Sequence, residues 1–346
     1  MCGIVGYVGY DEAAGKIIEG LKKLEYRGYD SSGIAILSDK GIELNKCKGE
    51  IKNLENMIAG RVPSGTCGIG HTRWATHGAP SDVNSHPHMD QSGRVALVHN
   101  GIVENYLELK EALINEHGIK FKSETDSEVI AQLVGVKYNA NGGDLEKAVY
   151  DAIKEMRGTY AIGVIAEDTP DKIVAYRKEA PLIAGLGKKS NFIASDIPAL
   201  LKYTNDIFLI ENDEMVICTP DSITIKDKDG KEVKREAMKI TWSVEDAEKG
   251  GYEHFMLKEI NEQPKVVAET LNRRIDEDGK IKLDGINLTK EELDKYNKIY
   301  IVACGTAYHA GLVGKYVIEK MAGIAVEVDV ASEFRYRDPF IDEKTL

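Results

Sequence analysis

Cys2, the second residue of the chain, has the clearest capacity for chemistry. If Met1 is removed, Cys2 becomes the N-terminus and carries both a thiol and a free α-amine. A cysteine thiol has a pKa of about 8.5 and an α-amine one of about 7.7–8.0, so near neutral pH the amine can accept the thiol proton. Such a residue can act as a nucleophile without a histidine partner. The alternative is a small buried cysteine near the chain end.

Two later segments carry groups suited to holding a substrate. Arg73 has a planar guanidinium that can bind a carboxylate, although a solvated surface ion pair is the ordinary alternative. Asn100 and Gly101 follow an apolar run. An amide side chain and a glycine N–H at a strand end can form an oxyanion hole, and the alternative is a tight Asn-Gly hairpin turn.

Other polar residues allow further interpretations. Asp126 can bind a substrate ammonium group, or it can cap the helix that is predicted to follow it. His86-Pro87-His88 places two potential metal ligands together, but the proline fixes the local chain and no third ligand is suitably spaced. We therefore predict no metal site. The cysteines form no C-x-x-C pair, which predicts neither a zinc site nor a disulfide framework and indicates a reducing compartment.

The elements that position these residues follow from the apolar pattern and the turn residues. Strands and helices are mixed over the first 220 or so residues, which predicts an α+β fold with helices layered on sheets. Predicted strands cover residues 3–9, 33–37, 41–48, 68–75, 94–99 and several short runs between 159 and 235. Predicted helices cover residues 16–26, 103–116, 125–138 and 144–157.

The second half of the chain has a different pattern. Residues 236–251 are polar and end in two glycines, which predicts a linker. Residues 252–275 are predicted to form a helix that Pro264 breaks or kinks. Residues 298–330 alternate strand, helix and strand, which is typical of a βαβ unit. Because a lone βαβ unit leaves its sheet edges uncovered, we expect the chain to be part of a longer protein.

Composition excludes several classes of protein. The net charge of -12 argues against nucleic-acid binding, which favours a basic surface. The sequence has no run of about 18 apolar residues and no charged-then-apolar leader, so we expect no membrane span and no signal peptide. A cytoplasmic location is the expectation that follows.

Together, five motifs resemble the glutaminase domain of the class II glutamine amidotransferases, which are N-terminal-nucleophile hydrolases. The resemblance implies a four-layer αββα sandwich. The motifs are Cys2-Gly-Ile-Val-Gly6, Leu24-Glu-Tyr-Arg-Gly-Tyr-Asp-Ser31, His71-Thr-Arg-Trp-Ala-Thr-His77, His99-Asn-Gly101 and Glu124-Thr-Asp126.

The resemblance also implies a role for each motif residue. Cys2 would attack the side-chain amide of L-glutamine, and Asn100 with the Gly101 N–H would hold the oxyanion. Arg73 would pair with the α-carboxylate of the substrate, and Asp126 with its α-ammonium group.

Four more roles rest on the same resemblance. Thr76 and His77 would line the glutamine pocket. Arg27 would help to order the N-terminal strand. Trp74 would act as a gate between this pocket and an ammonia channel.

Residues 298–337 resemble the start of a sugar-isomerase (SIS) domain, which has an α/β fold with a parallel sheet. The resemblance implies that Cys304, Gly305 and Thr306 lie in a loop that contacts a sugar phosphate, favoured by the following helix N-terminus. A plain βα turn is the alternative. Ala307 stands where this family commonly has a serine, so one hydroxyl contact is missing.

The two resemblances give a domain plan and expected partners. We expect a glutaminase domain over residues 2–235, a linker over 236–251 and the beginning of an SIS domain over 252–346. The substrates implied for the full-length enzyme are L-glutamine and fructose 6-phosphate, with no cofactor and with self-association into a homo-oligomer. The sequence stops before the serine-rich phosphate loop and the acid/base residues of the sugar site, so this fragment is expected to be a glutaminase only.

Two alternatives stay open at this point. One is another class II amidotransferase, such as the phosphoribosyl-diphosphate enzyme, which should carry a phosphoribosyltransferase domain instead of the 299–337 pattern. The other is a catalytically silent module that senses a sugar phosphate.

Overall fold

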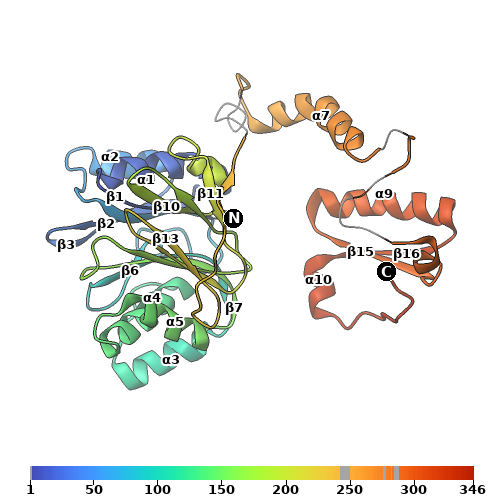
Figure 1. The fold of residues 1–346 in the computed structure, drawn as a ribbon. Helices are drawn as coiled ribbons and strands as arrows, with labels where there is room; N and C mark the ends of the chain where they lie inside the picture. The colour runs from blue at the N-terminus through green and yellow to red at the C-terminus, as the bar shows by residue number, and fades with distance from the viewer. Residues whose placement is uncertain (1, 242–249, 276–277, 282, 284–287) are drawn as a thin grey trace. The chain divides into compact units, whose positions relative to one another are not determined.

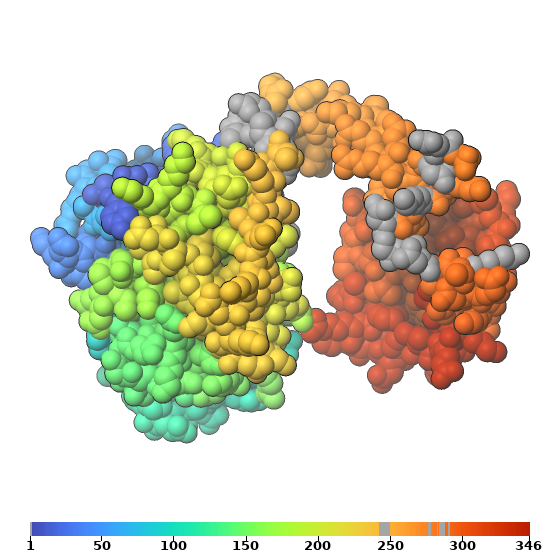
Figure 2. All heavy atoms as spheres, viewed as in Figure 1, coloured from blue at the N-terminus to red at the C-terminus, as the bar shows by residue number. Residues whose placement is uncertain are grey.

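The computed structural model describes residues 2–241, 250–275, 278–281, 283 and 288–346. The chain divides into two compact units, Met1–Gly251 and Tyr252–Leu346, which we call unit 1 and unit 2. Figures 1 and 2 show unit 1 in blue through yellow and unit 2 in orange to red. Each unit is described by itself.

An eight-stranded antiparallel sheet forms one inner layer of unit 1, with the strand order β14-β11-β9-β10-β1-β4-β2-β3. Strand β1 lies near its middle, so the chain begins in the interior of the domain, and Gly3 pairs with Thr72 of β4. The strands are β1 (Gly3–Gly9), β2 (Ser31–Ser38), β3 (Gly41–Lys48), β4 (Cys67–Arg73), β9 (Ile183–Leu186), β10 (Ser190–Ala194), β11 (Asp206–Leu209) and β14 (Met238–Lys239).

A six-stranded antiparallel sheet forms the second inner layer, in the order β13-β12-β8-β7-β6-β5. Its strand β6 pairs along its whole length with β7. The strands are β5 (His88–Met89), β6 (Val95–Val103), β7 (Gly158–Ala166), β8 (Ile173–Lys178), β12 (Glu214–Cys218) and β13 (Ile223–Lys226).

Helices cover the outer face of each sheet (Figure 1). Helices α1 (Ala13–Lys22) and α2 (Ile51–Ile58) pack on the large sheet, and α4 (Asp126–Ala140) and α5 (Leu145–Glu155) pack on the small one, with α3 (Tyr106–His117) against α4. In α2 the buried positions Ile51, Leu54 and Ile58 recur at helical spacing, which gives the helix one apolar face.

Unit 1 has three apolar clusters, and one of them lies between the two sheets. Its members include Ile4 and Ile69 from the large sheet and Val98 and Ile165 from the small one. The order of layers is therefore helix, sheet, sheet, helix, and the predicted four-layer αββα sandwich is confirmed. Strands β1 and β4 are buried at every position, as expected for a sheet that is covered on both faces.

Unit 2 contains the predicted βαβ unit. Strands β15 (Lys298–Ala303) and β16 (Ala325–Val330) pair in parallel and are joined by α9 (Gly305–Ala322). The other helices of unit 2 are α7 (Phe255–Asn272), α8 (Lys290–Leu293) and α10 (Ala331–Tyr336).

Helix α7 continues through Pro264, so a break at this proline is not observed. Proline removes one backbone N–H donor from the helix, which would otherwise bond to the carbonyl four residues earlier. That carbonyl belongs to Ile260, whose side chain is exposed, so water can take the place of the lost donor.

The predicted linker lies partly outside the described residues. Met238 and Lys239 form β14 and pair with β11, which joins them to the large sheet of unit 1. Residues 242–249 lie outside the described residues, and so does Met1. The linker boundaries therefore stay a prediction. Within the described ranges, none of the helices has the length and apolar character needed to span a bilayer.

Candidate active site

Cys2 immediately precedes β1 and is partly buried. Its Sγ atom lies 3.3 Å from the backbone N of Trp74, whose N–H donates to the sulfur, and 3.5 Å from the Trp74 carbonyl oxygen. Burial raises the pKa of the Cys2 thiol, while the Trp74 N–H and the positive charge of Arg73 act in the opposite direction. A backbone donor and a nearby cation are features that stabilise a thiolate.

Arg73 ends strand β4 and is only 3% exposed, so the alternative of a solvated surface ion pair is wrong. Its Nη2 donates to the backbone carbonyls of His77 and Gly78. Its Nη1 is buried and has no hydrogen-bond acceptor among the residues that the structure describes. A buried charged donor without an acceptor is costly, so this atom is well placed to receive a ligand.

Asn100 and Gly101 lie inside strand β6, where they pair with Ala161 and Tyr160 of β7. The alternative of an Asn-Gly hairpin turn is therefore wrong. Asn100 Nδ2 donates to the Cys2 carbonyl oxygen at 3.2 Å. Gly101 has a φ of 120°, and a Cβ atom there would lie 2.0 Å from the Thr159 carbonyl oxygen, so no other residue fits without a backbone shift.

Asp126 is the first residue of α4, but it is not the cap of that helix. Thr125 occupies the N-cap position, and its hydroxyl accepts from the Glu128 N–H at 3.2 Å. The buried Asp126 carboxylate instead accepts from the Val103 N–H at 3.0 Å, which ties the start of α4 to the end of β6. This carboxylate lines a cavity and is available to a cation there.

A cavity of about 390 Å³ brings these residues together. Every site residue predicted in unit 1 lines it, although the residues come from widely separated positions in the sequence. They are Cys2, Arg27, Arg73, Trp74, Thr76, His77, Asn100, Gly101 and Asp126. The three residues predicted for a sugar phosphate, Cys304, Gly305 and Thr306, lie in unit 2 at the start of α9, where all three are exposed.

Arg27 and Trp74 lie at the edge of this cavity. Arg27, in a short 3-10 helix (Glu25–Arg27), forms an ion pair with Asp196. Ser195, which precedes Asp196, forms two hydrogen bonds with Ile4 of β1. Its hydroxyl accepts from the Ile4 N–H and its own N–H donates to the Ile4 carbonyl, both at 3.0 Å. Trp74 is 45% exposed and contacts the Tyr29 ring edge-to-face at 5.5 Å.

A group of buried histidines was not predicted as part of the site, although His86 and His99 line the cavity. His71 Nε2 lies 2.9 Å from Asn100 Oδ1 and 3.0 Å from the His99 carbonyl oxygen. The His86 ring stacks on that of His71, with centroids 4.1 Å apart. His99 Nδ1 lies 2.8 Å from the Ser127 hydroxyl. His71 and His99 open two of the motifs, but only the folded chain shows what they contact.

Burial keeps these histidines neutral. It lowers the pKa of His71 to about 3 and that of His86 well below its ordinary value, and neighbouring positive charges act in the same direction. In the His86-Pro87-His88 segment, one ring nitrogen of each histidine has a protein partner. His86 Nδ1 accepts from the His99 N–H at 3.4 Å, and His88 Nε2 lies 3.0 Å from the Thr125 hydroxyl. In the described ranges, no group of three or more His, Cys, Asp or Glu side chains is arranged to hold a metal ion.

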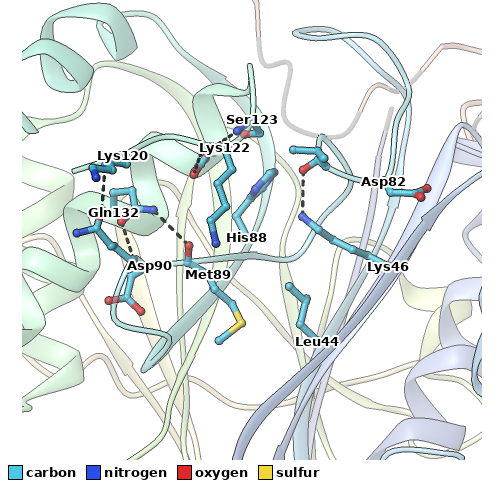
Figure 3. A pocket seen from close by; sticks show the side chains of 13 residues that line it. Leu44, Lys46, Asp82, His88, Met89, Asp90, Lys120, Lys122, Ser123 and Gln132 are labelled. Carbon is cyan, nitrogen blue, oxygen red and sulfur yellow. Dashed lines mark hydrogen bonds between the residues drawn. The ribbon is translucent and has the colours of Figure 1, made fainter. Parts of the chain in front are cut away.

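A second, more open cavity of about 760 Å³ shares the 86–88 segment as a wall (Figure 3). Lys46 of β3 lines it and donates from Nζ to the carbonyls of Val83, Ser85 and Pro87 at 2.6–3.1 Å. Burial lowers the pKa of Lys46 to about 8. Lys46 therefore anchors the loop that carries His86, and the cavity itself contains no cysteine.

Profiles of two known families match parts of the chain. A family profile described as a glutamine amidotransferase domain matches residues 71–202, and one described as an SIS domain matches residues 292–346. The chain therefore contains a glutamine amidotransferase domain. The amidotransferase match contains Arg73, Asn100, Gly101 and Asp126, and the SIS match contains the βαβ unit.

One similar relative is the glutamine–fructose-6-phosphate aminotransferase [isomerizing] of Clostridium tetani, which is 58% identical over 346 residues. The match covers 100% of this chain and 56% of the relative, so this chain spans little more than half the length of the curated relatives that it matches.

Solved structures support the fold. A glutamine phosphoribosylpyrophosphate (PRPP) amidotransferase from B. subtilis has a TM-score of 0.57 and 21% identity, covering 94% of this chain and 65% of that one. An allosteric regulatory enzyme of purine biosynthesis has a TM-score of 0.57 and 26% identity, covering 66% of this chain and 49% of that one.

Proposed function

We propose that unit 1 is a glutaminase, which hydrolyses the side-chain amide of L-glutamine through a thioester on Cys2. One observation carries this proposal: Cys2 Sγ, the Asn100 amide and the unpartnered Arg73 Nη1 share one cavity. A nucleophile, an oxyanion donor and a buried cation for a carboxylate are the groups that acyl transfer from an amino acid requires.

The substrate is held by its two charged ends. The Arg73 guanidinium receives the α-carboxylate of glutamine, and the Asp126 carboxylate receives the α-ammonium group. Thr76 and His77 line the same pocket. Because the two charges of glutamine lie at a fixed distance from its side-chain amide, pinning both orients that amide for attack.

In the first half of the reaction, the Cys2 sulfur attacks the amide carbon, and the α-amine exposed by removal of Met1 takes up the thiol proton. The oxyanion that forms is held by Asn100 Nδ2 and the Gly101 N–H. The α-amine then passes the proton to the amide nitrogen, the C–N bond breaks, and ammonia leaves a γ-glutamyl thioester behind.

In the second half, a water molecule attacks the thioester carbon and gives its proton to the α-amine. The C–S bond breaks as the second oxyanion collapses, glutamate departs, and the thiol is restored. Arg27 supports this site by ordering β1, since its partner Asp196 adjoins Ser195, which is hydrogen-bonded to Ile4 of β1. Trp74 gates the exit of ammonia.

We further propose that the full-length protein uses this ammonia to convert fructose 6-phosphate to glucosamine 6-phosphate, as a glutamine–fructose-6-phosphate aminotransferase (isomerising). The name of the 58% identical relative and the SIS match support this assignment. Cys304, Gly305 and Thr306 contact the sugar phosphate, and the full-length enzyme forms a homo-oligomer. The glutaminase domain covers residues 2–235, a linker follows over 236–251, and the SIS part begins at residue 252.

Another class II amidotransferase, such as the phosphoribosyl-diphosphate enzyme, is a weaker proposal. The B. subtilis PRPP amidotransferase shares the fold at 21% identity, which carries no assignment of substrate. The SIS match over residues 292–346 weighs against it.

Glutamate release from L-glutamine by the purified chain tests the glutaminase. We expect release by the parent chain, none by Cys2→Ala, and an unchanged rate for Cys47→Ala, which removes a thiol in β3 outside the cavity. Intact mass should show that Met1 has been removed.

Release that survives in Cys2→Ala would overturn the proposed nucleophile. No release by a parent chain that lacks Met1 would favour the silent sugar-phosphate module, which predicts that fructose 6-phosphate raises the melting temperature of the parent and Cys2→Ala chains equally.

A further inference from the structure

The Asn100 side chain has two orientations with nearly the same shape. In one, its NH₂ group faces the Cys2 cavity, and in the other its carbonyl oxygen does. Only the NH₂ group can donate to an oxyanion, whereas the carbonyl oxygen would repel it. The proposed glutaminase therefore needs a second group that selects one orientation, and the following inference rests on that function.

His71 lies on the side of Asn100 away from the cavity. It belongs to β4 of the large sheet, whereas Asn100 belongs to β6 of the small sheet, so their contact bridges the two layers. His71 Nε2 lies 2.9 Å from Asn100 Oδ1 and 3.0 Å from the His99 carbonyl oxygen. The cavity lining includes Asn100 but not His71, which identifies His71 as a support for a lining residue.

The contacts of His71 determine which nitrogen carries the proton. Nε2 faces two acceptors, the Asn100 Oδ1 atom and a backbone carbonyl, so it must be the donor. Nδ1 is buried and has no hydrogen-bond partner within the described part of the chain. A proton on Nδ1 would leave a buried donor unpaired and would turn a lone pair of Nε2 toward two oxygens. The Nε2–H form avoids both costs.

The surroundings hold the His71 ring in place. His71 is fully buried, and its backbone pairs with Ile4 of β1 on one side and with Gly33 of β2 on the other. Its ring stacks on His86, with an interplanar angle of 16°. The donor therefore has a fixed direction, and burial keeps the imidazole neutral near pH 7.

We propose that His71 is a positioning residue, which donates from Nε2 to Asn100 Oδ1 and so holds the Asn100 NH₂ group toward the Cys2 cavity. The Asn100 Nδ2 atom already points that way, because it donates to the Cys2 carbonyl oxygen at 3.2 Å. Without the His71 donor, the amide can rotate and present its carbonyl to the oxyanion. The effect then appears in the transition state and not in the binding of glutamine.

Three substitutions of His71 test this role through glutamate release. His71→Leu removes the donor, and we expect kcat to fall about a hundredfold with KM nearly unchanged, as for loss of one oxyanion donor. His71→Gln keeps a donor near the Nε2 position and should stay within about tenfold of the parent. His71→Asn has the same amide but is one methylene shorter, so it cannot reach Asn100 and should resemble His71→Leu.

A double-mutant cycle separates positioning from general damage. In an Asn100→Ala background, His71→Leu should cause no further loss of kcat, because its effect acts only through the Asn100 amide. Tyr138→Phe is the matched control, since it removes a buried hydroxyl that contacts Asp168 outside the cavity and should leave the rate unchanged. Additive losses in the double variant would overturn the proposal.

A binding measurement supplies a second readout. The aldehyde analogue, glutamate γ-semialdehyde, adds to the Cys2 thiol and forms a tetrahedral oxyanion, whereas glutamate binds without one. We expect His71→Leu to weaken binding of the aldehyde by the same factor as kcat/KM and to leave glutamate binding unchanged. Equal weakening of both ligands would contradict the proposal.

The outcomes distinguish this inference from the function on which it rests. If the parent chain, processed at Met1, releases no glutamate, the proposed glutaminase fails. If the parent chain works and a folded His71→Leu variant keeps its rate, the glutaminase stands and the role of His71 is wrong. If His71→Leu fails to fold, the rates of the His71→Gln and His71→Asn variants decide. Equal rates for these two variants would also overturn the positioning role of His71.

Discussion

Units 1 and 2 bury their apolar side chains to very different extents. In unit 1, residues such as Leu54 and Val98 are completely buried within three apolar clusters. In unit 2, helix α9 is also rich in apolar residues, yet Val313 is 64% exposed and Met321 81% exposed. Among the residues of unit 2 that the structure describes, Val326 is the one apolar side chain that is buried.

This difference shows that an apolar pattern specifies an element but does not by itself bury it. Each sheet of unit 1 has a layer on both faces, so every apolar face meets another. In unit 2, two parallel strands and one connecting helix bury little of each other. The predicted site residues differ in burial in the same way. Arg73 of unit 1 is buried, whereas Cys304 of unit 2 is exposed.

The largest effect that we expect concerns the cores of the two units. Leu54→Ala in α2 leaves a cavity beneath a fully buried side chain and should lower the free energy of unfolding of unit 1 by about 2–5 kcal/mol. Val313→Ala in α9 removes an exposed side chain and should change stability by less than about 0.5 kcal/mol. Hydrogen exchange in urea, followed by mass spectrometry, measures both units in one sample. Similar losses in both units would break the contrast between them.

The next effect concerns two arginines. Arg73→Lys keeps the charge but loses the planar guanidinium in a buried site, so kcat/KM for glutamine should fall about a hundredfold, mainly through KM. The matched control is Arg337→Lys in unit 2, where the arginine pairs with Asp329 and is half exposed. We expect that variant to stay within about twofold of the parent. A steady-state assay of glutamate release measures both, and an active Arg73→Lys variant would contradict the assigned carboxylate site.

The smallest effect, counted for one residue, is the contribution of a single buried histidine to the pH dependence of the stability of unit 1. Burial lowers the pKa values of His71, His86 and His88 in the folded state. Above about pH 6.5 both states are neutral, but below it the unfolded chain binds protons that the folded chain excludes, so stability falls as the pH falls. Each histidine contributes up to about 1.4 kcal/mol per pH unit, and for His71 this continues down to about pH 3.

Urea unfolding at pH 7 and pH 5 measures this dependence, because the carboxylates titrate mostly below that range. The His71→Gln variant should show a slope that is smaller by up to about 1.4 kcal/mol per pH unit. An unchanged slope in that variant would show that His71 does not contribute, and a slope of the same size in unit 2 would remove the contrast between the units.

Much of the architecture followed from local patterns. The apolar runs at residues 3–9 and 94–99 predicted strands, and the mixed order of strands and helices predicted sheets with helices layered on them. The strand, helix and strand over residues 298–330 predicted the parallel pair. These features depend on periodicity within one segment, which the sequence displays directly. The predicted break at Pro264 is wrong because helix α7 continues through it, and the predicted kink stays a prediction.

The sequence by itself also identified the residue types of the site. A cysteine behind Met1, an arginine in a predicted strand and an Asn-Gly pair after an apolar run suggested a nucleophile, a carboxylate partner and an oxyanion hole. Each residue had an ordinary alternative that the sequence left open. For Arg73 that alternative was a solvated ion pair, for Asn100 a turn, and for Asp126 a helix cap.

Only the tertiary structure decided among those alternatives, because each depends on neighbours that are distant along the chain. Arg73 is buried because the sandwich closes over it, and Asn100 lies within a strand because β6 pairs with β7 through residue 103. The contact of His71 with Asn100 crosses from one sheet to the other. No local pattern specifies a hydrogen bond between two sheets, since it exists only after both apolar faces have packed together.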